Sequence, residues 1–137
     1  MTSAGNDWLL SCVPHPRHVQ WSWEAGEFAL VTSTAWTVVE ASLLRSHAVL
    51  REFQRMGKQA GPVLAYSERN LAWWLVGDGA EAHLAGVKEL SVKPRGWQLP
   101  CPPAHVTFQG IRWLENPDGS GRLTDVCDLR SAVETVR

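Results

Sequence analysis

Two adjacent tryptophans, Trp73 and Trp74, stand in the middle of the apolar run 71–76, and they constrain the fold more than any other feature of the sequence. A second apolar run, residues 63–66, precedes it, and polar residues ending at Asn70 separate the two. This arrangement predicts a β-hairpin in which Asn70 adopts a left-handed conformation. Neighbouring residues on a strand point to opposite faces of a sheet. One tryptophan therefore lies outside the primary core or under a further layer.

The segments before the hairpin predict a strand and a long helix. Residues 28–32 form a short β-favouring apolar run, which is typical of a buried strand. Thr34 then stands at the position of a helix N-cap, and apolar residues recur at helical spacing over 36–56. Gly57 is suited to end that helix.

The segments after the hairpin predict shorter elements. Residues 80–85 suit one or two helical turns, and Thr124 or Asp125 can cap a final helix. The apolar stripe of that helix is Val126, Leu129, Val133 and Val136. Three short strands are expected, at residues 87–92, 97–101 and 111–114.

A chain of 137 residues is of a size for one domain. We expect residues 1–20 to form an N-terminal arm that packs through Trp8, and residues 21–137 to form a single α+β domain. Its mixed or antiparallel sheet would carry helices on one face. Trp21 and Trp23 alternate, so in an extended segment they would share one face.

Charge and cysteine content narrow the function classes. A formal net charge of −1 counts against a dedicated nucleic-acid binder, which usually has a basic excess. No apolar run is long enough for a membrane span, and the first residues lack the pattern of a signal peptide. The three cysteines form no close pair, which argues against a disulfide framework. We therefore expect a cytoplasmic protein with no membrane association.

Candidate metal ligands and nucleophiles are sparse. Cys12, His15 and His18 lie close together, but neighbouring prolines restrict the backbone and no fourth zinc ligand is evident. The sequence therefore predicts no metal and no cofactor. Cys101 and Cys127 lack the local patterns of thiol enzymes, so we expect both to be buried and unreactive.

Eight tryptophans make this chain tryptophan-rich. Exposed aromatic side chains can stack on bases or anchor a protein partner. Packing in the core and at its rim is the favoured interpretation, because aromatic residues dominate cores as well as interfaces.

Several short strings resemble the N-terminal domain of bifunctional DNA primase/polymerases (prim-pol) of the archaeo-eukaryotic primase superfamily. The resemblance spans about residues 21–136 and implies a prim-pol-like fold. The strings that carry it are Phe28-Ala29-Leu30-Val31, residues 56–63, Trp73-Trp74-Leu75-Val76, residues 95–103 and residues 109–117.

The same resemblance implies a degenerate active site. Active members carry acidic motifs and a histidine on strands. Here Ala29 and Thr32 stand at the first acidic motif, and the tryptophan pair stands at the histidine. Lys93 and Pro94 stand before Arg95-Gly96, where a further acid is expected. Because these motif residues are missing, the resemblance implies a prim-pol-like domain that is not catalytic. The fold alone does not imply the activity.

The function expected from these observations is a binding or regulatory module, with a protein partner favoured because the charge is near neutral. A nucleotide or single-stranded nucleic acid is the alternative ligand. A nucleotidyl transferase that uses Asp78, Glu89 or Asp125, and a homo-oligomer with a tryptophan-rich interface, stay open. The expected ligand- or partner-binding residues are Trp73, Trp74, Arg95, Trp97, Arg112 and Trp113.

Overall fold

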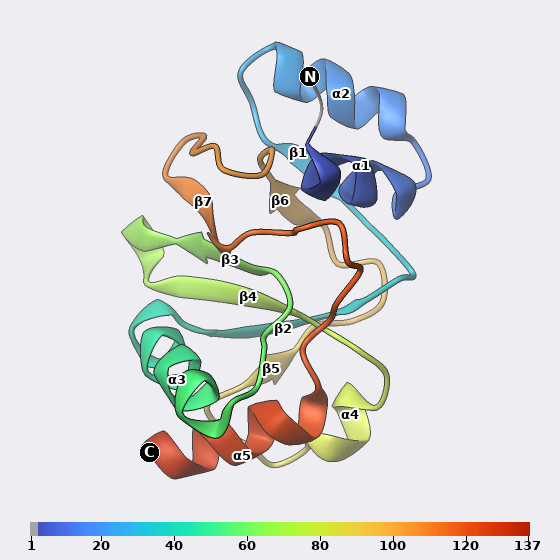
Figure 1. Ribbon diagram of the computed structural model, residues 1–137. Helices are drawn as coiled ribbons and strands as arrows, with labels where there is room; N and C mark the ends of the chain where they lie inside the picture. The colour runs from blue at the N-terminus through green and yellow to red at the C-terminus, as the bar shows by residue number, and fades with distance from the viewer. Residues whose placement is uncertain (1–2) are drawn as a thin grey trace.

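A five-stranded antiparallel sheet in the order β5-β2-β4-β3-β7 forms the centre of the computed structural model, which describes residues 3–137 (Figure 1). Its strands are β2 (Thr37–Ser42), β3 (Val63–Tyr66), β4 (Leu71–Val76), β5 (Ser91–Val92) and β7 (Ile111–Glu115). A two-stranded sheet pairs β1 (Ala29–Val31) with β6 (Leu99–Cys101). The α-helices are α1 (Ala4–Ser11), α2 (Pro16–Glu24), α3 (Leu43–Met56), α4 (Ala80–His83) and α5 (Val126–Val136), and a short 3-10 helix, η1 (Ser67–Arg69), joins β3 to β4. The predicted α+β class with an antiparallel sheet is confirmed.

Both faces of the central sheet are covered, so the tryptophan pair of β4 is buried on both sides. Trp74 is 0% exposed and packs with α3 and α5 in one core. Trp73 is 6% exposed and packs in a second core with β1, β6 and α1. The expectation of helices on one face is wrong, because α1 and α2 lie on the opposite side from α3 and α5 (Figure 1). The further layer that the tryptophan pair requires is therefore present.

The predicted hairpin is confirmed. β3 and β4 pair in antiparallel register, and Asn70 in the turn between them has φ 53° and ψ 45°. The Asn70 side-chain oxygen accepts a hydrogen bond of 3.0 Å from the Leu44 N–H at the start of α3. Gly57 ends α3 in a left-handed conformation with φ 70°, as expected. The hairpin turn thus also helps to begin the helix that covers the sheet.

The predicted helix over residues 36–56 is wrong in its first part. Residues 37–42 form β2, and α3 begins at Leu43 with Ser42, not Thr34, as its N-cap. Val38 and Val39 are both buried, one in each core. A strand covered on both faces shows a continuous apolar run, which periodicity cannot distinguish from a buried helix.

The N-terminal segment is helical. α1 and α2 bury Leu9 and Val19 in the second core, and the expected division after residue 20 falls within α2. Trp21 and Trp23 therefore lie on a helix, and the extended segment expected for them is wrong. Pro16 stands in the first turn of α2, where a missing N–H has no consequence. Trp23 donates its indole N–H to the Cys101 carbonyl at 2.9 Å, which joins α2 to β6.

In the last third of the chain the elements follow the expected order, but β5 and β6 are shorter than the strands predicted there. Strand β5 covers two residues, because Leu90 N–H donates to the Val87 carbonyl in a turn and both side chains enter the first core. Asp125 is the N-cap of α5 and accepts from the Asp128 N–H at 2.9 Å. Cys101 is buried as expected, whereas Cys127 is exposed on the outer side of α5.

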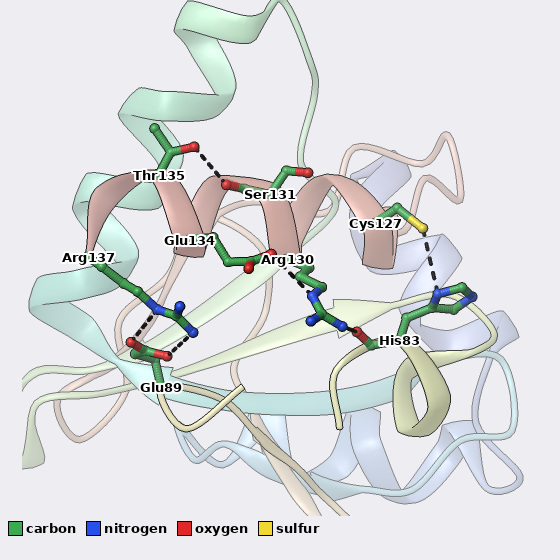
Figure 2. A network of polar contacts seen from close by, with 8 residues as sticks. All are labelled: His83, Glu89, Cys127, Arg130, Ser131, Glu134, Thr135 and Arg137. Atoms are coloured by element: carbon green, nitrogen blue, oxygen red, sulfur yellow. Dashed lines mark hydrogen bonds and ion pairs between the residues drawn. The ribbon is translucent and has the colours of Figure 1, made fainter. Parts of the chain in front are cut away.

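Polar contacts fasten α5 to the segment that contains α4 (Figure 2). Arg130 donates to the His83 carbonyl at 2.9 Å, and Arg137 donates twice to the Glu89 carboxylate, at 2.8 and 3.2 Å. Cys127 Sγ lies 3.8 Å from His83 Nδ1. These contacts hold α4 in place at the edge of the sheet.

Among the helices of residues 3–137, none combines the length and apolar character needed to cross a bilayer.

Candidate binding groove

A cavity of about 460 Å³ opens beside the edge of the central sheet. Its walls are the segment that leads into β2 (residues 33–38), the turn and first residues of α4 (78–82), and the segment after β5 (93–97). We call this cavity the Trp97 groove. A second hollow of about 380 Å³ adjoins it and is lined by Leu30 and residues 94–98.

The groove exists because β5 separates from β2. The Lys93 N–H donates to the Val38 carbonyl at 2.9 Å, which is the last backbone contact between the two segments. By the register of the two strands, Arg95 would be the next residue to face β2, but residues 94–97 form a turn instead. Trp97 N–H then donates to the Pro94 carbonyl at 3.1 Å, and Gly96 takes φ +85° in this turn. The chain therefore turns away from β2 and leaves the groove between them.

A chain of polar and aromatic contacts holds the Trp97 wall. The Lys93 ammonium lies 4.7 Å from the centre of the Trp97 ring and 3.4 Å from Glu40 Oε2. The other oxygen of Glu40 accepts the Trp73 indole N–H at 3.0 Å. Tyr66 stacks on Trp73, with ring centres 6.3 Å apart. A cation over an indole face is attracted by the ring quadrupole, so Lys93 links the Trp97 ring to the second core.

The indole N–H of Trp97 is buried and has no hydrogen-bond partner within residues 3–137. Leaving a buried donor unpaired costs about 1–3 kcal/mol. Lys93 thus holds the Trp97 ring in place without help from the indole N–H. Turning the ring toward an acceptor breaks no hydrogen bond that the described residues make.

The groove walls carry both signs of charge. Asp78 and Glu81 are exposed on the α4 side, and Arg95 is exposed on the opposite segment. None of these three side chains forms an ion pair within the described part of the chain, residues 3–137. They are therefore available to a ligand that matches them.

The structure brings together some of the expected binding residues and separates others. Arg95 and Trp97 line the groove, and Trp73 lies behind its wall. Trp74 lies in the first core, where its N–H donates to Ser46 Oγ at 3.0 Å. Arg112 and Trp113 are on β7, at the opposite edge of the sheet.

Trp113 is 4% exposed and donates its N–H to the Pro102 carbonyl at 2.8 Å. Its side chain, like that of Trp74, is thus used in packing. That any of the six expected residues contacts a ligand stays a prediction.

Sequence reasoning missed Glu40 as part of this site, because it lies in residues 36–56, which were expected to form one helix. Once residues 37–42 are a strand, the register of β2 and β4 sets Glu40 opposite Trp73. The β-branched residues Thr37, Val38 and Val39 were the local signal for that strand.

The other candidate carboxylates serve structural roles or stand alone. Glu89 pairs with Arg137, and Asp125 caps α5. The His15 and His18 rings lie 5.3 Å apart, and Cys12 contacts Ser11 Oγ. Within residues 3–137, no group of three or more His, Cys, Asp or Glu side chains could hold a metal ion.

Comparison of the chain with protein-family models, with curated proteins and with solved structures finds no match. The resemblance to prim-pol domains therefore stays a prediction that rests on the short strings of the sequence. What the groove can do is argued from its own residues.

Proposed function

We propose that this chain is a non-catalytic prim-pol-like module that binds a segment of a partner protein in the Trp97 groove and acts by that binding as a regulatory module. One observation carries the proposal: the contacts from Trp73 through Glu40 and Lys93 hold an indole ring at a groove. The Glu40 carboxylate accepts an N–H and pairs with an ammonium, so its role is to support the wall.

The chemistry of the walls favours a protein partner. Leu30 is 59% exposed and lines the hollow that adjoins the groove at Trp97. An aromatic ring beside an exposed aliphatic side chain suits an apolar anchor residue, which is the usual centre of a protein interface. Asp78 and Glu81 on the opposite wall would repel a polyanion and would attract a basic side chain.

The alternative ligand is a nucleotide or single-stranded nucleic acid. Trp97 offers a ring on which a base can stack, and Arg95 with Lys93 offers positive charge for a phosphate. The presence of one aromatic side chain and two cations at the groove is the observation that supports the alternative.

The test begins with photo-crosslinking from the groove. A benzoylphenylalanine placed in the host cell at Thr34, an exposed residue that lines the groove, is expected to capture one partner protein, whereas the same group at Arg51, on the exposed face of α3, captures none. The purified partner is then expected to bind the native chain, and to bind Trp97→Ala and Arg95→Glu at least about tenfold more weakly. Equal affinity for the native chain and both variants would exclude the groove as the binding site.

Titration of the purified protein separates the two ligand classes. A saturable, salt-sensitive change of tryptophan fluorescence with single-stranded DNA would favour the alternative. Metal-dependent addition of nucleotides to a primed template would overturn the non-catalytic assignment. For a protein-binding module, neither signal is expected.

A further inference from the structure

We propose that the ligand of the Trp97 groove is an extended peptide, which docks as an additional β-strand on the outer edge of β2. It would occupy the position that β5 leaves at Pro94. The inference rests on the proposed function and specifies the conformation and chemistry of the partner.

The register of β2 and β5 shows which backbone groups face this edge. Val39 is opposite Val92, and Lys93 donates to the Val38 carbonyl. In an antiparallel ladder, alternate residues turn both their N–H and their C=O toward the same neighbour. Val38 therefore faces the β5 side. Trp36 shares this side, because Trp36 and Val38 both bury their side chains in the second core at the spacing of a strand.

These backbone groups are only partly paired. The register sets Val38 opposite Lys93, just outside β5, and within residues 3–137 the Val38 N–H forms no hydrogen bond to the Lys93 carbonyl. Neither backbone group of Trp36 has a backbone hydrogen-bond partner in the same part of the chain. The cause is the turn at residues 94–97, which takes Arg95 away from the position opposite Trp36. Trp36 and Val38 both line the groove, so their unpaired groups face a cavity of about 460 Å³.

An unpaired strand edge is a template for another strand. Peptides that add to such an edge gain affinity from backbone hydrogen bonds and specificity from the pockets that alternate side chains enter. The β2 edge offers a donor at Val38, and a donor and an acceptor at Trp36. These are the groups that an antiparallel or parallel strand needs from its neighbour over three residues.

The walls select the side chains of the peptide. An apolar side chain would lie against Trp97 and Leu30, and a basic one would face Asp78 and Glu81 across the groove. Arg95 would accept an acidic neighbour. The backbone of single-stranded nucleic acid has no N–H donor, so it cannot supply the alternating donors and acceptors that complete the β2 edge.

The test uses peptides selected from a random ten-residue library displayed on phage, with the whole chain as bait. A recovered peptide is synthesised with an N-methyl group at each position in turn. Strand addition predicts a loss of roughly tenfold in affinity at every second position and little loss between them, because one side of the peptide backbone pairs with β2. Hydrogen exchange is expected to slow at the amides of Trp36 and Val38 on binding.

Matched variants separate this inference from the proposed function. Glu81→Lys and Arg95→Glu are expected to change the affinity at least about fivefold, whereas Arg51→Glu on α3 leaves it unchanged. The N-methyl groups could lower the affinity without a period of two while Glu81→Lys and Arg95→Glu still change the affinity of the same peptide. That result would overturn strand addition and leave the groove as a binding site. Binding that neither groove variant alters would overturn both proposals. A selection that yields no peptide, while an oligonucleotide binds at Trp97, would overturn the inference in favour of the nucleic-acid alternative.

Discussion

The indole N–H of Trp73 donates a hydrogen bond of 3.0 Å to Glu40 Oε1, across two strands whose register sets these residues opposite each other. The second oxygen of the same carboxylate lies 3.4 Å from the Lys93 ammonium. One carboxylate thus satisfies a buried donor of the second core and positions the cation that holds Trp97. The stability of the sheet and the shape of the groove are coupled through Glu40.

This coupling predicts different outcomes for two changes at Glu40. Glu40→Ala leaves the buried Trp73 N–H unpaired and should cost about 1–3 kcal/mol of unfolding free energy. Glu40→Gln keeps an acceptor oxygen and loses the charge, so its cost should stay below about 1 kcal/mol. Urea unfolding measures both. Equal losses would show that the hydrogen bond to Trp73 is not the stabilising contact.

Truncation should cost much more stability at Trp74 than at Trp21. Trp74 is fully buried against Phe53, so Trp74→Ala should lower the unfolding free energy by about 3–5 kcal/mol. Trp21 is 58% exposed, and Trp21→Ala should change it by less than about 0.5 kcal/mol. Denaturant unfolding of the two variants is the measurement. A large loss at Trp21 would indicate that its exposed face is covered in solution.

The stability of the fold should depend on both the side-chain acceptor and the left-handed conformation of Asn70. Asn70→Gly keeps the positive φ but removes the acceptor of the Leu44 N–H, and should cost about 1 kcal/mol. Asn70→Ala adds the strain of a left-handed residue, about 1–2 kcal/mol more. Thermal unfolding should rank the native chain above Asn70→Gly and Asn70→Ala last. The reverse order of the variants would contradict the turn geometry.

The three cysteines should react with iodoacetamide at very different rates. Cys127 is exposed and should react first. Burial raises the pKa of the Cys12 thiol, which lowers its thiolate fraction and slows its reaction. Burial also raises the pKa of Cys101, which is 0% exposed and should be protected until the chain unfolds.

Peptide mass spectrometry over time gives the order of alkylation. In concentrated urea, all three thiols should react at similar rates, which serves as the control. Early modification of Cys101 in the folded chain would contradict its place in the second core.

The pair of Glu89 and Arg137 should make stability depend on pH. Hydrogen bonds from Arg137 hold the pKa of Glu89 below its ordinary value. A carboxyl group of this kind stabilises the fold above its unfolded pKa of about 4.3, and the contribution is lost as pH falls through the folded pKa. Arg137→Gln should therefore reduce stability more at pH 7 than at pH 3. Urea midpoints of both chains at the two pH values give the comparison, and equal differences would contradict it.

The hairpin and the helix ends could be predicted from sequence because their signals are local. Asn70 and Gly57 adopt the left-handed conformations that their residue types favour, and Asp125 caps the helix that follows it. Each depends on a few neighbouring residues and on little else.

Strand β2 and the groove could not be predicted in the same way. Val38 and Val39 enter different cores, so the apolar pattern of residues 36–43 fits a helix as well as a strand. Because of that ambiguity Glu40 was assigned to a helix instead of β2, and its contact with Trp73 could not be predicted. The groove depends on where β5 leaves β2, a relationship between segments about 50 residues apart.

The tryptophan pair of β4 affects the register in which this strand pairs with its neighbours. Both faces of β4 are apolar, so hydrophobic burial alone would not penalise a slip by one residue along its neighbours, although such a slip exchanges the two faces. The indole N–H groups do distinguish them: Trp74 finds Ser46 on α3, and Trp73 finds Glu40 on β2. A slipped strand would bury both donors without acceptors. These two hydrogen bonds thus favour the native register of β4, which apolar packing alone does not distinguish from a slipped one.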